Sequence, residues 1–135
     1  MKNLISFILL FCFQVIFSQS NQDKAFEMGQ QGVKLIDNRH FDEAIVLLEK
    51  AQDLDQNSII YPYEIAYASY FKQDYKKAIN ILKKIQNHID ANDRVFQLLG
   101  NSFDKIGKQE ESQEVYKSGI IRFPNSGSLY GYVIQ

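Results

Sequence analysis

The residues that could support acid–base, nucleophilic or metal chemistry are few in this 135-residue chain, and they stand apart from one another. His40 and His88 are far apart in sequence, and the single cysteine, Cys12, lies in an apolar run near the amino terminus. A zinc site needs three or four ligands brought together, usually with short ligand spacings. The two histidines are therefore expected to be solvated or capping side chains, and no metal site is predicted.

Two pairs of neighbouring carboxylates, Asp42 with Glu43 and Glu110 with Glu111, are the remaining candidates for catalysis. Each pair falls at the start of an expected helix, where acidic side chains complement the helix dipole. Adjacent helical residues do not face each other, so neither pair forms a general acid and base. The chain also has no phosphate loop, no Gly-x-Ser-x-Gly elbow and no His-Glu-x-x-His motif. We expect no catalytic residue and no cofactor, and hence no enzyme.

The amino terminus has the order of regions typical of a secretory signal peptide. Lys2 precedes an apolar run over residues 4–17 with two polar interruptions, and small or polar residues follow at 18–20. A helix that crosses a bilayer needs about 20 apolar residues, more than this run contains. We predict a signal peptide at residues 1–18, cleaved after Ser18 or alternatively after Ser20, and a short segment at 19–24. An uncleaved membrane anchor is the alternative.

Export has consequences for the chemistry of the mature chain. Cys12 leaves with the signal peptide, so the mature chain has no thiol, which suits an oxidising compartment and excludes disulfides. Without Lys2, 14 basic residues face 16 acidic ones, and this balance argues against a nucleic-acid partner. We expect a periplasmic, outer-envelope or secreted protein whose mature chain does not insert into a membrane.

The clearest helical pattern lies in residues 96–125, which predict two helices back to back. Gly107 separates the helices and Pro124 ends the pair. Both helices carry an apolar or small residue at i, i+3, i+4 and i+7. The stripes are Phe96, Leu99, Gly100 and Phe103 in the first helix, and Ser112, Val115, Tyr116 and Gly119 in the second.

The same pattern occurs twice upstream. Expected helices cover 25–37 (capped at Ser20 or Asn21), 41–55, 62–72 and 75–88, and the returning helices begin at Phe41, Tyr75 and Gln109, each 34 residues after the last. Small residues recur with this period, and Ile85 alone breaks the rule. They are Gly32, Ala66 and Gly100 in the eighth position of the repeat, Ala44, Ala78 and Ser112 in the twentieth, and Ala51 and Gly119 in the twenty-seventh.

This arrangement resembles the tetratricopeptide repeat family, whose helix-turn-helix unit of about 34 residues opens with aromatic-x2-Leu-Gly-x2-aromatic and ends in proline. The resemblance covers 25–126 as three repeats (25–58, 59–92 and 93–126) and implies an all-α, right-handed superhelix of antiparallel helix pairs. The chain departs from the family pattern at Pro62 in an aromatic slot, at Gln56 and Asp90 in the proline slot, and at Gln31 in an apolar slot.

Residues 127–135 read as the start of a fourth repeat, with Tyr130 in the aromatic slot and Val133 and Ile134 in the next two. A solenoid normally ends in a helix with a polar outer face, and this apolar stretch is a poor lid. Three alternatives remain open: the sequence is the front part of a longer protein, the stretch docks as a short cap, or it is a dimer contact.

An aromatic stripe on the first helix of the second repeat stands apart from the packing slots. In the resembled family, slots 2, 5, 9, 12 and 13 of each first helix line a concave groove that binds extended peptides. These slots hold Phe26, Gly29, Val33, Ile36 and Asp37, then Ile60, Tyr63, Tyr67, Tyr70 and Phe71, then Arg94, Gln97, Asn101, Asp104 and Lys105. The partner-binding residues predicted from them are Phe26, Val33, Tyr63, Tyr67, Tyr70, Phe71, Arg94, Gln97 and Asn101.

The alternative for the tyrosines is ordinary packing between repeats, above all for Tyr70. The Lys/Asn clamp that some family members use for a terminal carboxylate is not matched in these slots. We expect a non-enzymatic scaffold in the cell envelope that binds a protein or extended peptide in the groove. The alternatives are a targeting module of a longer envelope enzyme or assembly factor, and a structural protein that self-associates through residues 127–135.

Overall fold

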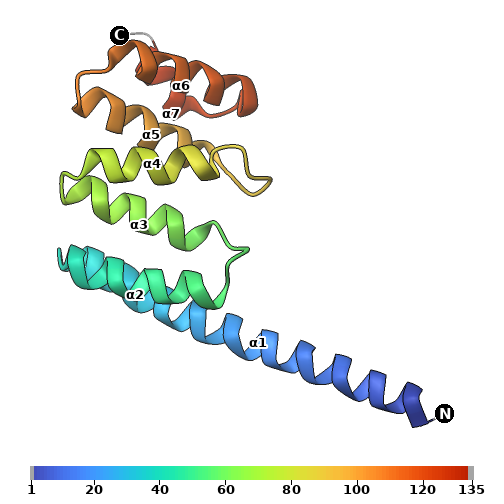
Figure 1. Cartoon of the computed structure of the whole chain (residues 1–135). Coiled ribbons are helices and arrows are strands. Elements are labelled where there is room, and N and C mark those ends of the chain that lie inside the picture. The colour runs from blue at the N-terminus through green and yellow to red at the C-terminus, as the bar shows by residue number, and fades with distance from the viewer. Residues whose placement is uncertain (1, 134–135) are drawn as a thin grey trace.

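The computed structural model describes the backbone of residues 2–133 and the side chains of residues 19–133, and this part of the chain is entirely α-helical (Figure 1). Seven helices follow one another without a strand between them in this range. They are α1 (Lys2–Asp37), α2 (Phe41–Leu54), α3 (Ile60–Phe71), α4 (Tyr75–Ile85), α5 (Asp93–Lys105), α6 (Gln109–Arg122) and α7 (Gly127–Val133). The predicted fold class is confirmed.

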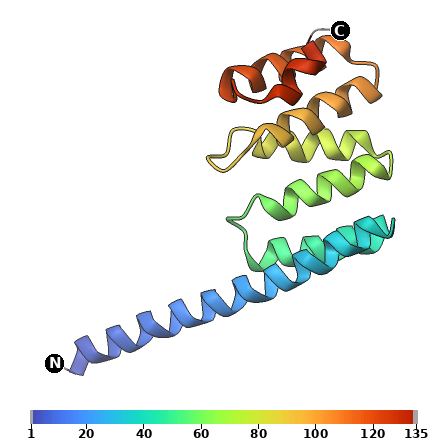
Figure 2. The same ribbon diagram turned by 180° about the vertical axis from the view of Figure 1, so that it is seen from behind.

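The helices stack in chain order as antiparallel pairs. Figure 1 shows α1 and α2 at one end of the stack and α6 and α7 at the other, and the amino-terminal half of α1 projects beyond the stack. Figure 2 shows the same order from behind, so the projection is not an effect of one viewpoint. The stack is a superhelical solenoid in which each pair rests on its neighbours.

The returning helices begin at the residues that the 34-residue period predicts, namely Phe41, Tyr75 and Gln109. Each follows a tight turn with one residue in the left-handed backbone conformation, at Arg39 (φ 64°), Gln73 (φ 71°) and Gly107 (φ 78°). These three residues share one position of the repeat, so all three turns have the same geometry.

The small residues of the eighth slot allow the two helices of a pair to cross closely. A Cβ added at Gly32 would lie 2.6 Å from Cγ of Leu48, and one added at Gly100 would lie 2.1 Å from Cε1 of Tyr116. Ala66 occupies the same slot in the second repeat and is fully buried. The predicted role of these residues in helix crossing is therefore seen directly.

The core runs the length of the stack, with one cluster around the first helix pair and a second around the later pairs. Its buried hydroxyl groups are satisfied locally: Ser69 donates to the carbonyl of Ile65 at 2.7 Å, and Ser102 donates to that of Leu98 at 2.6 Å. Among residues 19–133, no buried side-chain nitrogen or oxygen lacks a hydrogen-bond partner.

Several helix boundaries differ from prediction, and the helix expected to start near Pro62 starts at Ile60. The cap expected at Ser20 or Asn21 is wrong, because α1 runs without interruption from Lys2, and no glycine or proline lies in that stretch to break it. The helix expected to reach His88 ends at Ile85, three residues early. Within residues 2–133, none of the helices has the length and apolar character needed to cross a membrane.

Helix α7 docks on α5 and α6. Leu129 is fully buried, and the ring of Tyr132 stacks on that of Tyr116 with centroids 4.8 Å apart. Tyr130, expected in the buried aromatic slot, is instead 41% exposed, because no described helix follows α7 to cover it. Ile134, named with it, lies outside the described residues.

Candidate functional site

The odd-numbered helices form the inner side of the solenoid. Direct contacts join α1 to α3, α3 to α5 and α5 to α7, whereas α2 and α4 pack on α3 rather than on each other within the described chain. The side on which successive helices lie closer together is the concave side of the curved stack. All the predicted partner-binding residues belong to α1, α3 or α5.

Three aromatic side chains of α3 form a continuous row, which we call the aromatic ladder: Tyr63, Tyr67 and Phe71. The ring centroids are 6.4 Å apart between Tyr63 and Tyr67, and 4.7 Å apart between Tyr67 and Phe71. A spacing of four residues places them on one face of the helix. The two tyrosines are half-buried, and Phe71 is 45% exposed, so the ladder keeps surface that a ligand can cover.

Tyr70 does not belong to this row. Its ring packs edge-on against Tyr75 of α4, with centroids 5.3 Å apart, and burial raises the pKa of its phenol. Tyr70, predicted as a partner-binding residue, therefore contributes to packing within the second helix pair, which is the alternative that the sequence left open for this tyrosine.

A mostly apolar cavity of about 530 Å³ lies between α1 and α3, beside the amino-terminal end of the ladder. It brings together Phe26 and Val33, both predicted, with Ile60. Phe26 and Ile60 are 60% and 61% exposed, which is unusual for large apolar side chains. A Cβ at Gly29 would lie 2.8 Å from Cε1 of Tyr61, so this glycine allows the Tyr61 ring to pack closely on α1.

A second cavity of about 340 Å³ lies at the other end of the ladder. Tyr67 and Phe71 line it together with Ile36, Asp37 and Phe41. The ladder therefore runs between two hollows of the same face. Ile36, assigned to the groove by resemblance, is only 6% exposed and belongs mainly to the core.

Sequence reasoning missed Glu64, Lys34 and Tyr61, which also line the larger cavity. Burial raises the pKa of the Glu64 carboxyl group, Arg94 opposes this shift, and Asp37 adds to it. A signal was present, because Glu64 is the only charged residue of α3. A single carboxylate in an otherwise uncharged helix marks a position worth testing.

Arg94 of α5 lies near the boundary between the second and third helix pairs. Burial raises the pKa of the Tyr63 phenol to about 12, and the positive charge of Arg94 opposes the shift. Since Arg94 also acts on Glu64, its guanidinium group links the ladder and the larger cavity electrostatically.

The polar continuation predicted on α5 is engaged inside the protein. The amide of Gln97 donates to Oγ of Ser128 in α7. The Tyr116 hydroxyl lies 2.8 Å from Oδ1 of Asn101 and 2.9 Å from Oδ2 of Asp104. The structure therefore groups Phe26, Val33, Tyr63, Tyr67, Phe71 and Arg94, and it ties Gln97 and Asn101 to α6 and α7.

Groups suited to metal chemistry do not converge in the described part of the chain. No three His, Cys, Asp or Glu side chains among its residues are arranged to hold a metal ion. His40 lies 3.5 Å from a carboxylate oxygen of Glu43, and His88 lies 3.5 Å from one of Asp90.

No family model and no curated protein matches the sequence. Solved structures do. The first TPR of Spaghetti (RPAP3), bound to the HSP90 peptide SRMEEVD, has a TM-score of 0.75 and 20% identity over 83% of this chain and 89% of its own. The Arabidopsis OM64 TPR domain has a TM-score of 0.75 and 13% identity over 83% and 93% of the two chains.

The TPR2AB domain of yeast Sti1, in a complex with pHSP90, is 26% identical, with a TM-score of 0.72 over 81% of this chain and 44% of that one. These similarities establish the fold, and the 34-residue period with its small crossing residues agrees with them. The chain therefore has the fold of a tetratricopeptide repeat domain.

Proposed function

We propose that this protein is an exported, non-enzymatic scaffold that binds a partner protein or an extended peptide on its concave face. The observation that carries the proposal is the partly exposed aromatic ladder of α3, which runs between two hollows of the same face. Capture of bound proteins in the native host would identify the partner.

The side chains of this face are suited to binding. Aromatic residues bury a large area for little loss of side-chain freedom and dominate the energetics of many interfaces. Contacts between neighbouring rings already hold Tyr63, Tyr67 and Phe71 in place, which lowers the entropic cost of binding. A bulky apolar side chain of the partner would enter the cavity beside Phe26 and Ile60.

The polar groups beside the ladder would give direction to the ligand. Glu64 and Arg94 carry opposite charges near Tyr63. Partly buried charges of this kind discriminate between partners more than they add to affinity. An extended segment with a polar or charged residue next to its apolar anchor fits this arrangement.

The comparisons support peptide binding as a mode for this fold, since the Spaghetti domain is bound to an HSP90 peptide. We do not transfer that ligand to this chain. The Lys/Asn clamp that some family members use for a terminal carboxylate is not matched in its groove slots. The proposed partner is recognised through apolar and aromatic contacts instead.

The proposed location is the periplasm or the outer side of a cell envelope. The order of a basic residue, an apolar run and small polar residues over residues 2–20 supports export. The absence of cysteine after residue 18 suits that environment.

The experiment compares capture of partners by the parent chain and by a Tyr63→Ala/Tyr67→Ala variant after crosslinking in the native host. We expect the variant to keep its helical content and to lose the captured proteins. Val46→Ala is the matched control, because Val46 is 52% exposed on α2, away from the concave face. A folded double variant that captures the same proteins as the parent would overturn the proposal.

A further inference from the structure

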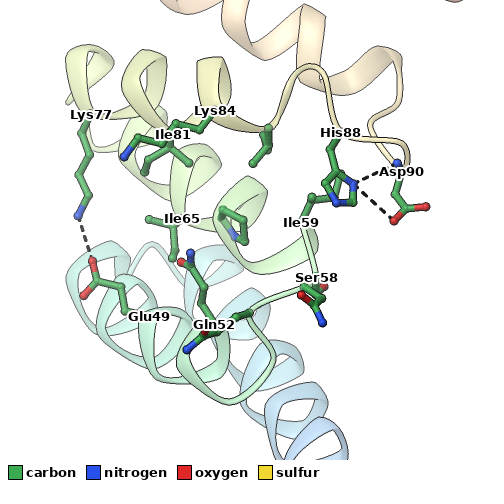
Figure 3. A pocket seen from close by; sticks show the side chains of 14 residues that line it. Glu49, Gln52, Ser58, Ile59, Ile65, Lys77, Ile81, Lys84, His88 and Asp90 are labelled. Carbon is green, nitrogen blue, oxygen red and sulfur yellow. Dashed lines mark hydrogen bonds and ion pairs between the residues drawn. The ribbon is translucent and has the colours of Figure 1, made fainter.

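A third cavity, of about 750 Å³, lies on the opposite face of the solenoid between α2 and α4. We call it the convex cavity. Figure 3 shows Ile65 of α3 and Ile81 of α4 toward its floor, and Gln52 of α2 and His88 at its margin. At the far end, Nζ of Lys77 pairs with Oε1 of Glu49 at 3.3 Å and bridges the two helices.

The next junction along the solenoid, between α4 and α6, is closed by the last turn of α6 and the loop after it. Arg122 donates from Nη1 to the carbonyl of Gln86 and from Nη2 to that of His88, both at 2.5 Å. The following residue, Phe123, packs edge-on against Phe96 with centroids 5.8 Å apart. Arg122 therefore bridges these two repeats, and the ring of Phe123 packs on α5 within the third repeat.

The 34-residue period identifies what replaces these groups at the convex cavity. His88 corresponds to Arg122, Ile89 corresponds to Phe123, and Pro62 corresponds to Phe96. Helix α4 ends at Ile85, whereas α6 continues to Arg122, so the equivalent turn is missing from the second repeat. Ile89 is 86% exposed and does not enter the gap. The convex cavity therefore lies where the second repeat has no equivalent of the Arg122 and Phe123 side chains of the third repeat.

Acidic residues at the end of α2 favour a cation there, whereas Lys84 and Lys77, the latter paired with Glu49, line the facing side of the cavity on α4. Gln52 and Leu54 occupy the positions of Gln86 and His88, whose carbonyls accept from Arg122 at the next junction. The last turn of α2 contains no basic residue, and Asp53 and Asp55 lie in and after it. The carbonyl end of a helix is stabilised by positive charge, and here the helix itself supplies none.

We propose that the convex cavity binds a partner segment in which an arginine is followed directly by an aromatic residue. The aromatic ring would lie on the apolar floor formed by Pro62, Ile65 and Ile81, and the guanidinium group would bind the carbonyl end of α2. The partner thus supplies at this junction an arginine contact and an aromatic ring like those that Arg122 and Phe123 supply at the next one. This site is separate from the concave face.

The test uses the full chain and a capped peptide with the sequence of its residues 119–125, Gly-Ile-Ile-Arg-Phe-Pro-Asn. We expect titration with this peptide to shift the NMR signals of Gln52, Ile65, Ile81 and His88. A control peptide with alanine in place of the arginine and the phenylalanine should bind at least about tenfold more weakly.

Two variants place the site. Gln52→Arg puts a positive charge beside the carbonyl end of α2 and should weaken peptide binding about tenfold or more. His88→Arg/Ile89→Phe restores the missing pair within the chain and should compete with the peptide. Tyr63→Ala, on the concave face, should leave binding unchanged.

Equal binding of the alanine peptide, unchanged binding to Gln52→Arg, or shifts confined to the concave face would each overturn the proposal. A higher melting temperature for His88→Arg/Ile89→Phe, with no peptide binding by the parent chain, would show a packing gap and would also overturn it. These outcomes do not depend on the concave face, because Tyr63→Ala reports on that face separately.

Discussion

At the scale of single residues, the left-handed turn positions are sites of avoidable strain. Arg39, Gln73 and Gly107 share this backbone conformation, but only the third is glycine. For residues with a Cβ, the left-handed helical conformation costs roughly 1–2 kcal/mol. The first two turns therefore hold residues that the geometry disfavours, and the surrounding helices keep them there.

Gln73→Gly should raise the free energy of unfolding by about 0.5–1 kcal/mol, since relief of strain exceeds the added freedom of the unfolded chain. Urea denaturation followed by circular dichroism measures the change. The reverse substitution, Gly107→Ala, is the matched control and should lower stability, although a Cβ there would meet no atom within 4 Å. A loss of stability in Gln73→Gly would refute the explanation.

Glu64 makes the stability of the folded protein depend on pH, and the direction of this dependence follows from the environment of its carboxyl group. Burial raises the pKa of its carboxyl group in the folded state, so the folded protein holds this proton to a higher pH than the unfolded chain does. The ionised form is thus penalised by folding. The penalty is absent at low pH and grows as the pH rises from the unfolded pKa through the folded one.

Glu64→Gln should therefore raise the melting temperature at pH 7 and have little effect at pH 3.5, where Glu64 is mostly protonated in both states (about one unit below the ordinary value). Thermal denaturation at both pH values measures the difference between variant and parent. Asp53→Asn is a control on an exposed carboxylate of α2. A larger gain at pH 3.5 than at pH 7 would contradict the direction of the shift.

At the scale of helices, the close crossing of α5 and α6 depends on Gly100. The ring of Tyr116 lies over this residue, and its hydroxyl group hydrogen-bonds to Asn101 and Asp104 of α5. The Tyr116 side chain is fully buried. One glycine therefore determines both the distance between the two helices and the position of a buried phenol.

Gly100→Leu should lower the free energy of unfolding by about 1–3 kcal/mol, because the new side chain collides with the Tyr116 ring. Gly131→Ala in α7 is the control, since a Cβ there meets no atom within 4 Å, and alanine favours the helix over glycine. Chemical denaturation of both variants provides the comparison. An unchanged midpoint for Gly100→Leu would mean that the helices do not cross as closely as described.

The starts of the returning helices α2, α4 and α6 were predictable because the apolar face repeats every 34 residues. The early end of α4 could not be predicted, because no glycine or proline lies between Ile85 and the start of α5. The next start depends on a local cap, in which Asn92 accepts from the backbone N–H of Arg94 at 3.1 Å. An apolar face predicts which residues are covered but not where a helix frays.

The candidate site likewise has one part that could be predicted from the sequence and one part that could not. Helical spacing alone places Tyr63, Tyr67 and Phe71 in a row, so this part could be predicted. The engagement of Gln97 by Ser128 could not, because it requires α7 to dock on α5 over a sequence distance of 31 residues. Polar side chains on a solenoid surface have the same pattern whether they meet solvent or a neighbouring repeat.

At the scale of the whole molecule, the two faces differ because of their place in the repeat. The concave face keeps aromatic surface on helices that touch one another, and the convex face has a gap where one repeat lacks an Arg–aromatic pair. The core itself consists of two buried clusters, one around the first helix pair and one around the later pairs. The solenoid is a common support for two separate surfaces.

The amino-terminal part of α1 should contribute little to the stability of this support. From Gln19 to Lys24 no side chain is buried, and Ala25 is the first buried one among the side chains that the structure describes. A chain that begins at Gln19 should therefore unfold within about 0.5 kcal/mol of the full chain, as expected for changes at exposed positions. A chain that begins at Met28 loses the packing of Ala25 and should be less stable than both.

Thermal and urea denaturation of the three chains provide the measurement, and the chain that begins at Met28 shows that the assay detects a loss of core packing. If the chain that begins at Gln19 lost as much stability as that control, the first turns of α1 would have to support the solenoid. Cleavage near Ser18 would then leave a weakened protein, and the proposal of a removable signal peptide would be contradicted.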